Sequence, residues 1–228
     1  DGVHSRSFAG NGLVVMHDPD AGGLGLVLVD RNTVAVGPSD VNLTFGAHPA
    51  EVAGTVRYLH PLHNFAVVSY RLADLPPEAL RRVRAAELLP FPRLRRGEAV
   101  RLVGLTKHVR VMQRRSTVTN TTAALTLSGA EVPRFRAVHE EVVRLDQDFG
   151  ATFSGVLADD RGRVRALWGS YSEQVDKEER EWCAGLPIGV AAPWLERLAA
   201  AARAGGGGIL RPPRVRVLDA ELEAVLLS

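Results

Sequence analysis

Short apolar runs separated by turn residues occupy the first two thirds of the chain. The runs are rich in β-branched residues and are bounded by Gly, Pro, Asn and Asp, which is typical of strands joined by turns. They cover Gly12–Met16, Gly25–Val29, Thr33–Val36, Asn42–Phe45, Glu51–Leu59, Phe65–Tyr70, Ala99–Val103, Val109–Asn120, Arg136–Val143, Gly155–Leu157 and Val164–Ser170. This spacing predicts an all-β barrel or sandwich rather than alternating strands and helices.

Two features organise these strands. The turn sequence Asp18–Gly23 separates the first two runs and predicts a hairpin between them. The segment Asp74–Pro92 contains several prolines and one short candidate helix, which indicates a connection between two halves of a β-domain.

The pattern changes after Gly189. Residues Ala192–Arg203 are strong helix formers with Pro near the start, and Trp194, Leu195 and Leu198 share one helical face that can pack on the β-domain. Gly205–Gly208 is a flexible linker. We therefore expect one domain over residues 1–204, and residues 209–228 are too short to bury a core and are expected to begin a following domain.

Composition excludes several classes of protein. Of the 228 residues, 46% are hydrophobic and 24% are charged, which is typical of a globular chain and not of a disordered one. No apolar run approaches the roughly 18 residues of a membrane span. The single Cys183 excludes a disulfide framework and a Cys-rich zinc site, and nothing in the sequence indicates its role. Because the chain starts at Asp1, we expect it to be part of a longer polypeptide.

Basic residues are concentrated in one stretch. The net charge is only +2, yet the segment Arg81–Arg96 holds six arginines. A β-rich nucleic-acid-binding module using this stretch is one hypothesis. We favour a solvated loop and helix face instead, because no aromatic residues are interleaved for base stacking. Nucleic acid is therefore not an expected partner.

Few residues offer catalytic chemistry. Ser154 lies in a small-residue turn before a strand, where a hydroxyl could meet backbone N–H donors, although the segment does not match Gly-x-Ser-x-Gly. His60 and His63 are three residues apart, but no second cluster of ligands accompanies them, so we predict neither a metal nor a cofactor. No phosphate-binding loop is present in the sequence.

The order of four segments resembles a chymotrypsin-fold protease domain of the Deg/HtrA (Do-like) family. These segments are Gly25–Val34, His60–Val68, Asp146–Leu157 and Asp160–Trp168. The resemblance covers about residues 8–200 and is nearest to the second protease domain of the long, duplicated members in plants, algae and fungi. It implies an all-β, two-barrel trypsin-like fold of two six-stranded barrels, a C-terminal helix and then the start of a PDZ-like domain.

The residues at the family's catalytic positions depart from its pattern. In active relatives the first segment carries the catalytic histidine, and that position falls on Asn32. The aspartate position falls on Asn64, and the nucleophile position falls on Phe153, with Ser154 one residue later. An amide cannot take a proton from a hydroxyl near neutral pH, and a serine without a base is a poor nucleophile.

Two hypotheses follow from the resemblance. In the first, this is a non-catalytic domain of a PDZ-containing serine protease that scaffolds, oligomerises or binds unfolded or peptide segments, and contacts other domains of the same polypeptide. In the second, it is an active serine endopeptidase that uses Ser154 with His60 or His63. Relatives occur in chloroplasts and in nuclei, so the resemblance implies an intracellular location without choosing between them.

Overall fold

The computed structural model describes residues 9–20, 22–34, 40–46, 50–106, 110–125, 140–147, 149, 154–175 and 178–205. The first half of the chain contains β1 (Gly12–Asp18), β2 (Leu24–Val29), η1 (Arg31–Thr33), β3 (Val41–Leu43), β4 (Val52–Leu59), β5 (Ala66–Arg71), η2 (Leu72–Asp74) and α1 (Pro77–Arg82). The second half contains β6 (Ala99–Leu105), β7 (Val111–Leu125), β8 (Glu140–Leu145), β9 (Gly155–Ala158), β10 (Val164–Val175), β11 (Glu178–Pro187) and α2 (Ile188–Gly205).

The first half is an antiparallel sheet in the order β1-β2-β5-β4-β3. All six residues of β2 are buried, because apolar side chains cover both of its faces. Leu26 and Leu28 pack into one core cluster, and Val27 and Val29 pack into another on the opposite face. This explains why the strand has a continuous apolar run and no alternation of apolar and polar residues.

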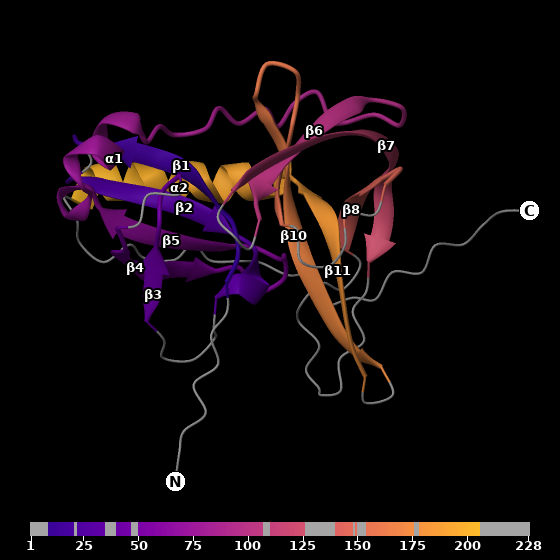
Figure 1. The fold of residues 1–228 in the computed structure, drawn as a ribbon, viewed down its shortest axis with the longest axis horizontal. Coiled ribbons are helices and arrows are strands. Elements are labelled where there is room, and N and C mark those ends of the chain that lie inside the picture. Colours follow the sequence, from indigo (N-terminus) through magenta and orange to yellow (C-terminus); the bar gives the residue numbers. More distant parts are fainter. Residues whose placement is uncertain are drawn as a thin grey trace, which may run out of the picture.

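The second half is a closed six-stranded barrel in the order β10-β11-β8-β7-β6-β9. Its interior contains Leu102, Val118, Leu157 and Trp168, which come from four different strands. Closure leaves the barrel without an unpaired edge strand of the kind that promotes aggregation. The long hairpin of β10 and β11 projects beyond the rest of the barrel (Figure 1).

Helix α2 joins the two halves through a shared core. Ile188, Leu195 and Leu198 are buried against residues of β1, β2 and β5, and the same cluster contains Val164 and Leu167 of β10. Figure 1 shows the helix lying alongside β1 and β2. The C-terminal helix therefore packs mainly on the first half although it follows the second half in sequence.

The connection between the halves is held by backbone hydrogen bonds to both. The amide of Ala86 donates to the Val14 carbonyl at 2.8 Å, and the amide of Leu89 donates to the Val164 carbonyl at 2.8 Å. The prediction that Asp74–Pro92 connects two β-halves is confirmed, including its short helix, α1.

The all-β, chymotrypsin-like fold, the six-stranded second barrel and the first hairpin are as predicted, with four corrections. Thr33 lies in the 3-10 helix η1 and not in a strand. Strand β11 was not predicted. The C-terminal helix begins at Ile188 and not at Ala192, and it includes Gly205. The described part of the first half has five strands where the resemblance implied six.

Residues 206–228, where a linker and a following PDZ-like domain were predicted, lie outside the described residues. Among the residues that the structure describes, no helix is long and apolar enough to span a membrane.

Candidate functional site

The backbone of Ser170 in β10 is the meeting point of three side chains from the first half. The Asn32 Nδ2 amide donates to the Ser170 carbonyl oxygen at 2.9 Å, and the Asn64 Nδ2 amide donates to the same oxygen at 2.7 Å. The Ser170 amide donates in turn to Asp30 Oδ2 at 3.3 Å. The two asparagines, which are separated by a whole β-hairpin in sequence, therefore share a single acceptor.

Asp30 positions Asn32. Its Oδ1 accepts hydrogen bonds from the Thr33 amide and the Thr33 hydroxyl, both at 2.9 Å, and so caps the 3-10 helix that carries Asn32. The carboxyl is buried, and this burial raises its pKa above the usual value, although the hydrogen bonds from Thr33 and Ser170 oppose the rise. A Cβ at Gly169 would lie 2.8 Å from Asp30 Cβ, so only glycine allows this close approach.

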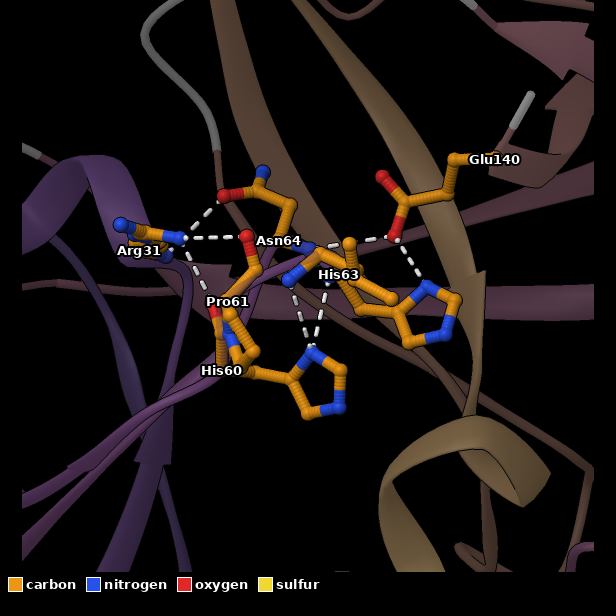
Figure 2. A network of polar contacts seen from close by, with 7 residues as sticks. Arg31, His60, Pro61, His63, Asn64 and Glu140 are labelled. Carbon is orange, nitrogen blue, oxygen red and sulfur yellow. Dashed lines mark hydrogen bonds and ion pairs between the residues drawn. The ribbon is translucent and has the colours of Figure 1, made fainter. Parts of the chain in front are cut away.

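Asn64 closes the turn before β5, as Figure 2 shows. Its Oδ1 accepts the backbone amide of Arg31 at 3.1 Å, and the backbone amide of Asn64 donates to Glu140 Oε1 at 3.1 Å. The Arg31 guanidinium donates to the carbonyls of His60 and Pro61, at 2.6 and 3.1 Å. Every polar group of the Asn64 side chain is therefore used to hold the turn to η1 and to β10.

His60 is a buried part of this turn. Its Nδ1 accepts the backbone amides of Leu62 and His63, at 3.2 and 2.9 Å, so the ring proton resides on Nε2. The ring contacts Phe65 and Trp194, with centroids 4.7 and 5.1 Å away. Burial, reinforced by His63 and Arg31, lowers the pKa of His60 to about 4. The imidazole is neutral at physiological pH, and its one lone pair is engaged.

His63 pairs with a carboxylate of the second barrel. Its Nδ1 lies 3.0 Å from Glu140 Oε1, and its side chain is 35% exposed whereas that of Glu140 is 2% exposed. Figure 2 shows the pair beside Asn64. The neighbouring Tyr171 is buried, and its burial and the nearby Glu140 charge raise its pKa well above the usual value. A carboxylate that orients the Nδ1 side of an imidazole leaves Nε2 as the side that can exchange a proton.

Ser154 contacts Asn11 rather than either histidine. Its Oγ accepts the Asn11 amide at 3.3 Å, and its carbonyl accepts Asn11 Nδ2 at 2.6 Å. The same Nδ2 donates to the Leu105 carbonyl at 3.0 Å. A Cβ at Gly104 would lie 2.4 Å from the Ser154 carbonyl oxygen, so glycine is needed where β6 passes this residue.

The structure thus places Asn32 and Asn64 together at Ser170, and places His60 and His63 in the adjoining turn. Phe153 lies outside the described residues. Within the described part of the chain, no group of three or more side chains is arranged to hold a metal ion.

Sequence reasoning missed the other half of this network. Asp30, Ser170, Glu140 and Asn11 were not singled out. The Asp-x-x-Thr spacing of Asp30 and Thr33 was a readable capping signal, since Asp is a preferred cap. Glu140 carried no such signal, because its partner Asn64 is 76 residues away in sequence.

Comparisons with known proteins show what the chain is similar to. No family model matches the chain. Protease Do-like 7 of Arabidopsis thaliana is 44% identical over 237 residues, which cover 100% of this chain and 21% of the relative. The pro-apoptotic serine protease NMA111 of Saccharomyces cerevisiae is 32% identical over 166 residues, which cover 72% of this chain and 16% of that protein. The chain spans about a fifth of the length of these curated relatives.

Solved structures support the same fold. The structure of Deg5 has a TM-score of 0.55 at 16% identity and covers 82% of both chains. The apo MamO protease domain of Magnetospirillum magneticum has a TM-score of 0.54 at 16% identity, covering 85% of this chain and 90% of that one. The likeness to these structures shows the fold, and the similarity to the two long relatives shows the family. The chain belongs to the Deg/HtrA family of trypsin-like serine protease domains.

Proposed function

We propose that this domain is a non-catalytic member of its family, which scaffolds the longer polypeptide and binds unfolded or peptide segments. The observation that carries the proposal is the shared acceptor of Asn32 and Asn64, whose amides both donate to the Ser170 carbonyl. These two residues stand where the resemblance puts the catalytic histidine and aspartate.

The chemistry of an amide argues against a catalytic role for either residue. A serine protease needs a base that accepts the hydroxyl proton, and a negative charge that stabilises the resulting imidazolium. Neither asparagine is basic or charged. Loss of triad members costs on the order of 10⁴ to 10⁶ in rate in well-studied serine proteases.

The contacts of the displaced candidates also support the proposal. His60 cannot serve as a base through Nδ1, because two backbone amides already occupy that lone pair. His63, oriented by Glu140, has the form of a general base. However, the Ser154 hydroxyl accepts its hydrogen bond from Asn11. A Ser154–His63 pair would require the Ser154 hydroxyl to donate to His63 Nε2, and no such hydrogen bond is present among the described residues.

Proteolysis elsewhere in the longer protein is compatible with this role. The long relatives carry protease names, and this chain spans about a fifth of their length. We propose that catalysis belongs to another domain of the polypeptide. The present domain would then position its neighbours, including a following PDZ-like domain.

Cleavage of casein by the 228-residue chain, beside its Ser154→Ala variant, tests the proposal. We expect no cleavage by either protein, and no labelling of Ser154 by a fluorophosphonate probe that labels an active control protease. Cleavage that Ser154→Ala abolishes, together with labelling of Ser154, would overturn the proposal in favour of an active endopeptidase. Cleavage that persists in Ser154→Ala and resists the probe would indicate a contaminating protease, and repurification should remove it.

A further inference from the structure

An apolar pocket of about 140 Å³ lies on the second half of the molecule, apart from the Ser170 network. Its walls come from the connection between the halves, from β7 and β8, and from the start of α2. The apolar lining residues are Pro90, Phe91, Leu94, Val143, Pro187 and Val190. A cavity of about 150 Å³ with apolar walls is known to admit a benzene-sized group, so this pocket can take one large apolar side chain.

Phe91 makes the pocket unusual for a surface feature. Its side chain is 68% exposed, although a phenylalanine is normally buried. It lies beside Leu94, which is buried in the barrel core. An exposed aromatic ring at the mouth of an apolar pocket extends the surface that a ligand could cover.

The wall also holds a buried guanidinium that is already neutralised. The Arg165 side chain is 6% exposed, and its Nη1 lies 2.9 Å from Glu98 Oε1. Its Nη2 donates to the Pro92 carbonyl at 2.5 Å. Since Glu98 balances the charge, the remaining N–H groups favour a neutral acceptor, such as a peptide carbonyl, over an anion.

Backbone irregularities at two walls offer further hydrogen-bonding groups. Pro193 has no amide hydrogen, so the Gly189 carbonyl lacks the donor that an α-helix normally supplies four residues later. On another wall, the pairing of β7 with β8 shifts between Asn120 and Ala123, so Thr121 and Thr122 lie in a bulge outside the ladder, where the Thr122 amide donates to Asn120 Oδ1 at 2.9 Å and the carbonyls face no ladder partner. Main-chain groups of a bound peptide could pair with these positions.

The rim charges oppose a strongly charged partner. Arg93 and Glu141 are both exposed and lie 4.0 Å apart, and Arg165 and Glu98 form the second pair. Each of the two arginines that line the pocket is therefore paired with a carboxylate, Arg93 with Glu141 of the lining and Arg165 with Glu98 beside it. A nucleic acid or an anionic lipid surface would need an excess of positive charge here.

We propose that this pocket binds an extended polypeptide segment by enclosing one of its large apolar side chains. The side chain fills the space beside Phe91 and Leu94, and the flanking peptide groups pair with Arg165, the Gly189 carbonyl and the bulge at Thr122. The inference rests on the polypeptide-binding part of the proposed function and assigns it to a surface other than the Ser170 network.

Nuclear magnetic resonance titration of the 228-residue chain tests the site. The ligand is a neutral peptide of Gly and Ser with one central Phe, and the comparison peptide has Ser in place of Phe. We expect the Phe peptide to shift the amide signals of Phe91, Leu94, Thr122 and Val190. We expect the Ser peptide to bind at least about tenfold more weakly, because it forfeits burial of the ring.

Two variants and one control assign the binding to the pocket. Phe91→Ser removes the exposed wall and should weaken binding of the Phe peptide about tenfold. Thr122→Trp should fill the mouth of the pocket and weaken binding of the Phe peptide by a similar factor, while Phe91 itself is unaltered. Val111→Ser is the matched control, since Val111 is a 71% exposed apolar residue that does not line the pocket, and it should bind as the unaltered chain does.

The outcomes separate this inference from the proposed function. If casein binds the chain but the Phe peptide shifts signals elsewhere, or if Phe91→Ser and Thr122→Trp bind normally, the pocket assignment is wrong and the proposed function stands. If neither casein nor the Phe peptide binds, both the assignment and the polypeptide-binding role are overturned. If the pocket signals shift with protein concentration alone, a second copy of the chain occupies the pocket, and the assignment to a foreign segment is overturned.

Discussion

The turn at His60 links burial of a single imidazole to the stability of the fold. His60 is 1% exposed, and burial lowers its pKa from 6.5 to about 4. As the pH falls below 6.5, His60 binds a proton in the unfolded chain but stays neutral in the folded chain until the pH approaches 4. The free energy of unfolding should therefore fall between pH 6.5 and pH 4, by on the order of 2 kcal/mol from this residue.

Urea unfolding at pH 7.0, 5.5 and 4.5 measures this effect, with His60→Asn for comparison. The asparagine oxygen can still accept the amides of Leu62 and His63, but it does not titrate. We expect the variant to be less stable at pH 7 and to lose less stability on acidification. Burial also lowers the pKa of His17, which adds a dependence of the same sign to both proteins. Equal pH slopes in both proteins would contradict the assignment to His60.

At the scale of single residues, the sequence predicts the chemistry of a side chain better than its hydrogen-bond partners. The positions of Asn32 and Asn64 could be matched to the family's pattern, and their lack of basicity follows from the amide group alone. Their common acceptor could not be predicted, because it is a backbone oxygen that carries no residue-specific signal. The partner of His63 could not be predicted either, because Glu140 lies 77 residues away in sequence, in the other half of the molecule.

At the scale of elements, β10 approaches η1 so closely that Gly169 cannot carry a side chain. An added Cβ there would lie 2.8 Å from Asp30 Cβ, and both segments are held by the Ser170 hydrogen bonds. We expect Gly169→Ala to lower the free energy of unfolding by about 1–3 kcal/mol, as overpacking does in buried sites. Urea denaturation followed by tryptophan fluorescence measures the change.

Gly189→Ala is the matched control for Gly169→Ala, because the structure leaves room for a Cβ at Gly189. A Cβ at Gly189 would meet Pro90 at 3.6 Å or more, which is ordinary contact, and alanine favours a helix over glycine by up to about 1 kcal/mol. This variant should be as stable as the unaltered chain or more so. A stable Gly169→Ala would show that β10 and η1 can separate without cost, and would contradict the close junction described here.

Elements with a clear apolar run were predictable, and elements defined by tertiary context were not. Strand β2 has a continuous apolar run because both of its faces are buried. Strand β11 begins with the charged residues Glu178–Glu181, and its long pairing with β10 compensates for a sequence with no strand pattern there. Helix α2 begins at Ile188 because that residue and Ala191 are buried in the core shared by both halves, a tertiary constraint that helix propensity does not express.

At the scale of the whole molecule, the two halves are joined by a core and by a polar seam. The core holds Leu26 and Phe65 from the first half, Val164 and Leu167 from the second, and the buried face of α2. The seam consists of the bonds from Asp30, Asn32 and Asn64 to Ser170, from Glu140 to His63, and from Asn11 to Ser154. Asn32 and Asn64, which the sequence resemblance puts at the family's catalytic positions, thus connect the halves.

Because α2 packs in the shared core, removing one of its buried side chains should destabilise both halves together. Leu198 is 1% exposed, and Leu198→Ala should lower the free energy of unfolding by about 2–5 kcal/mol. Hydrogen exchange should then accelerate by a similar factor for the slowest amides of β5 and of β6, because both open in one transition. Leu80→Ala on α1, where the side chain is 38% exposed, should change stability by less than about 0.5 kcal/mol. If β6 keeps its exchange rates while β5 loses protection, the halves unfold separately, and the seam adds too little stability to couple them.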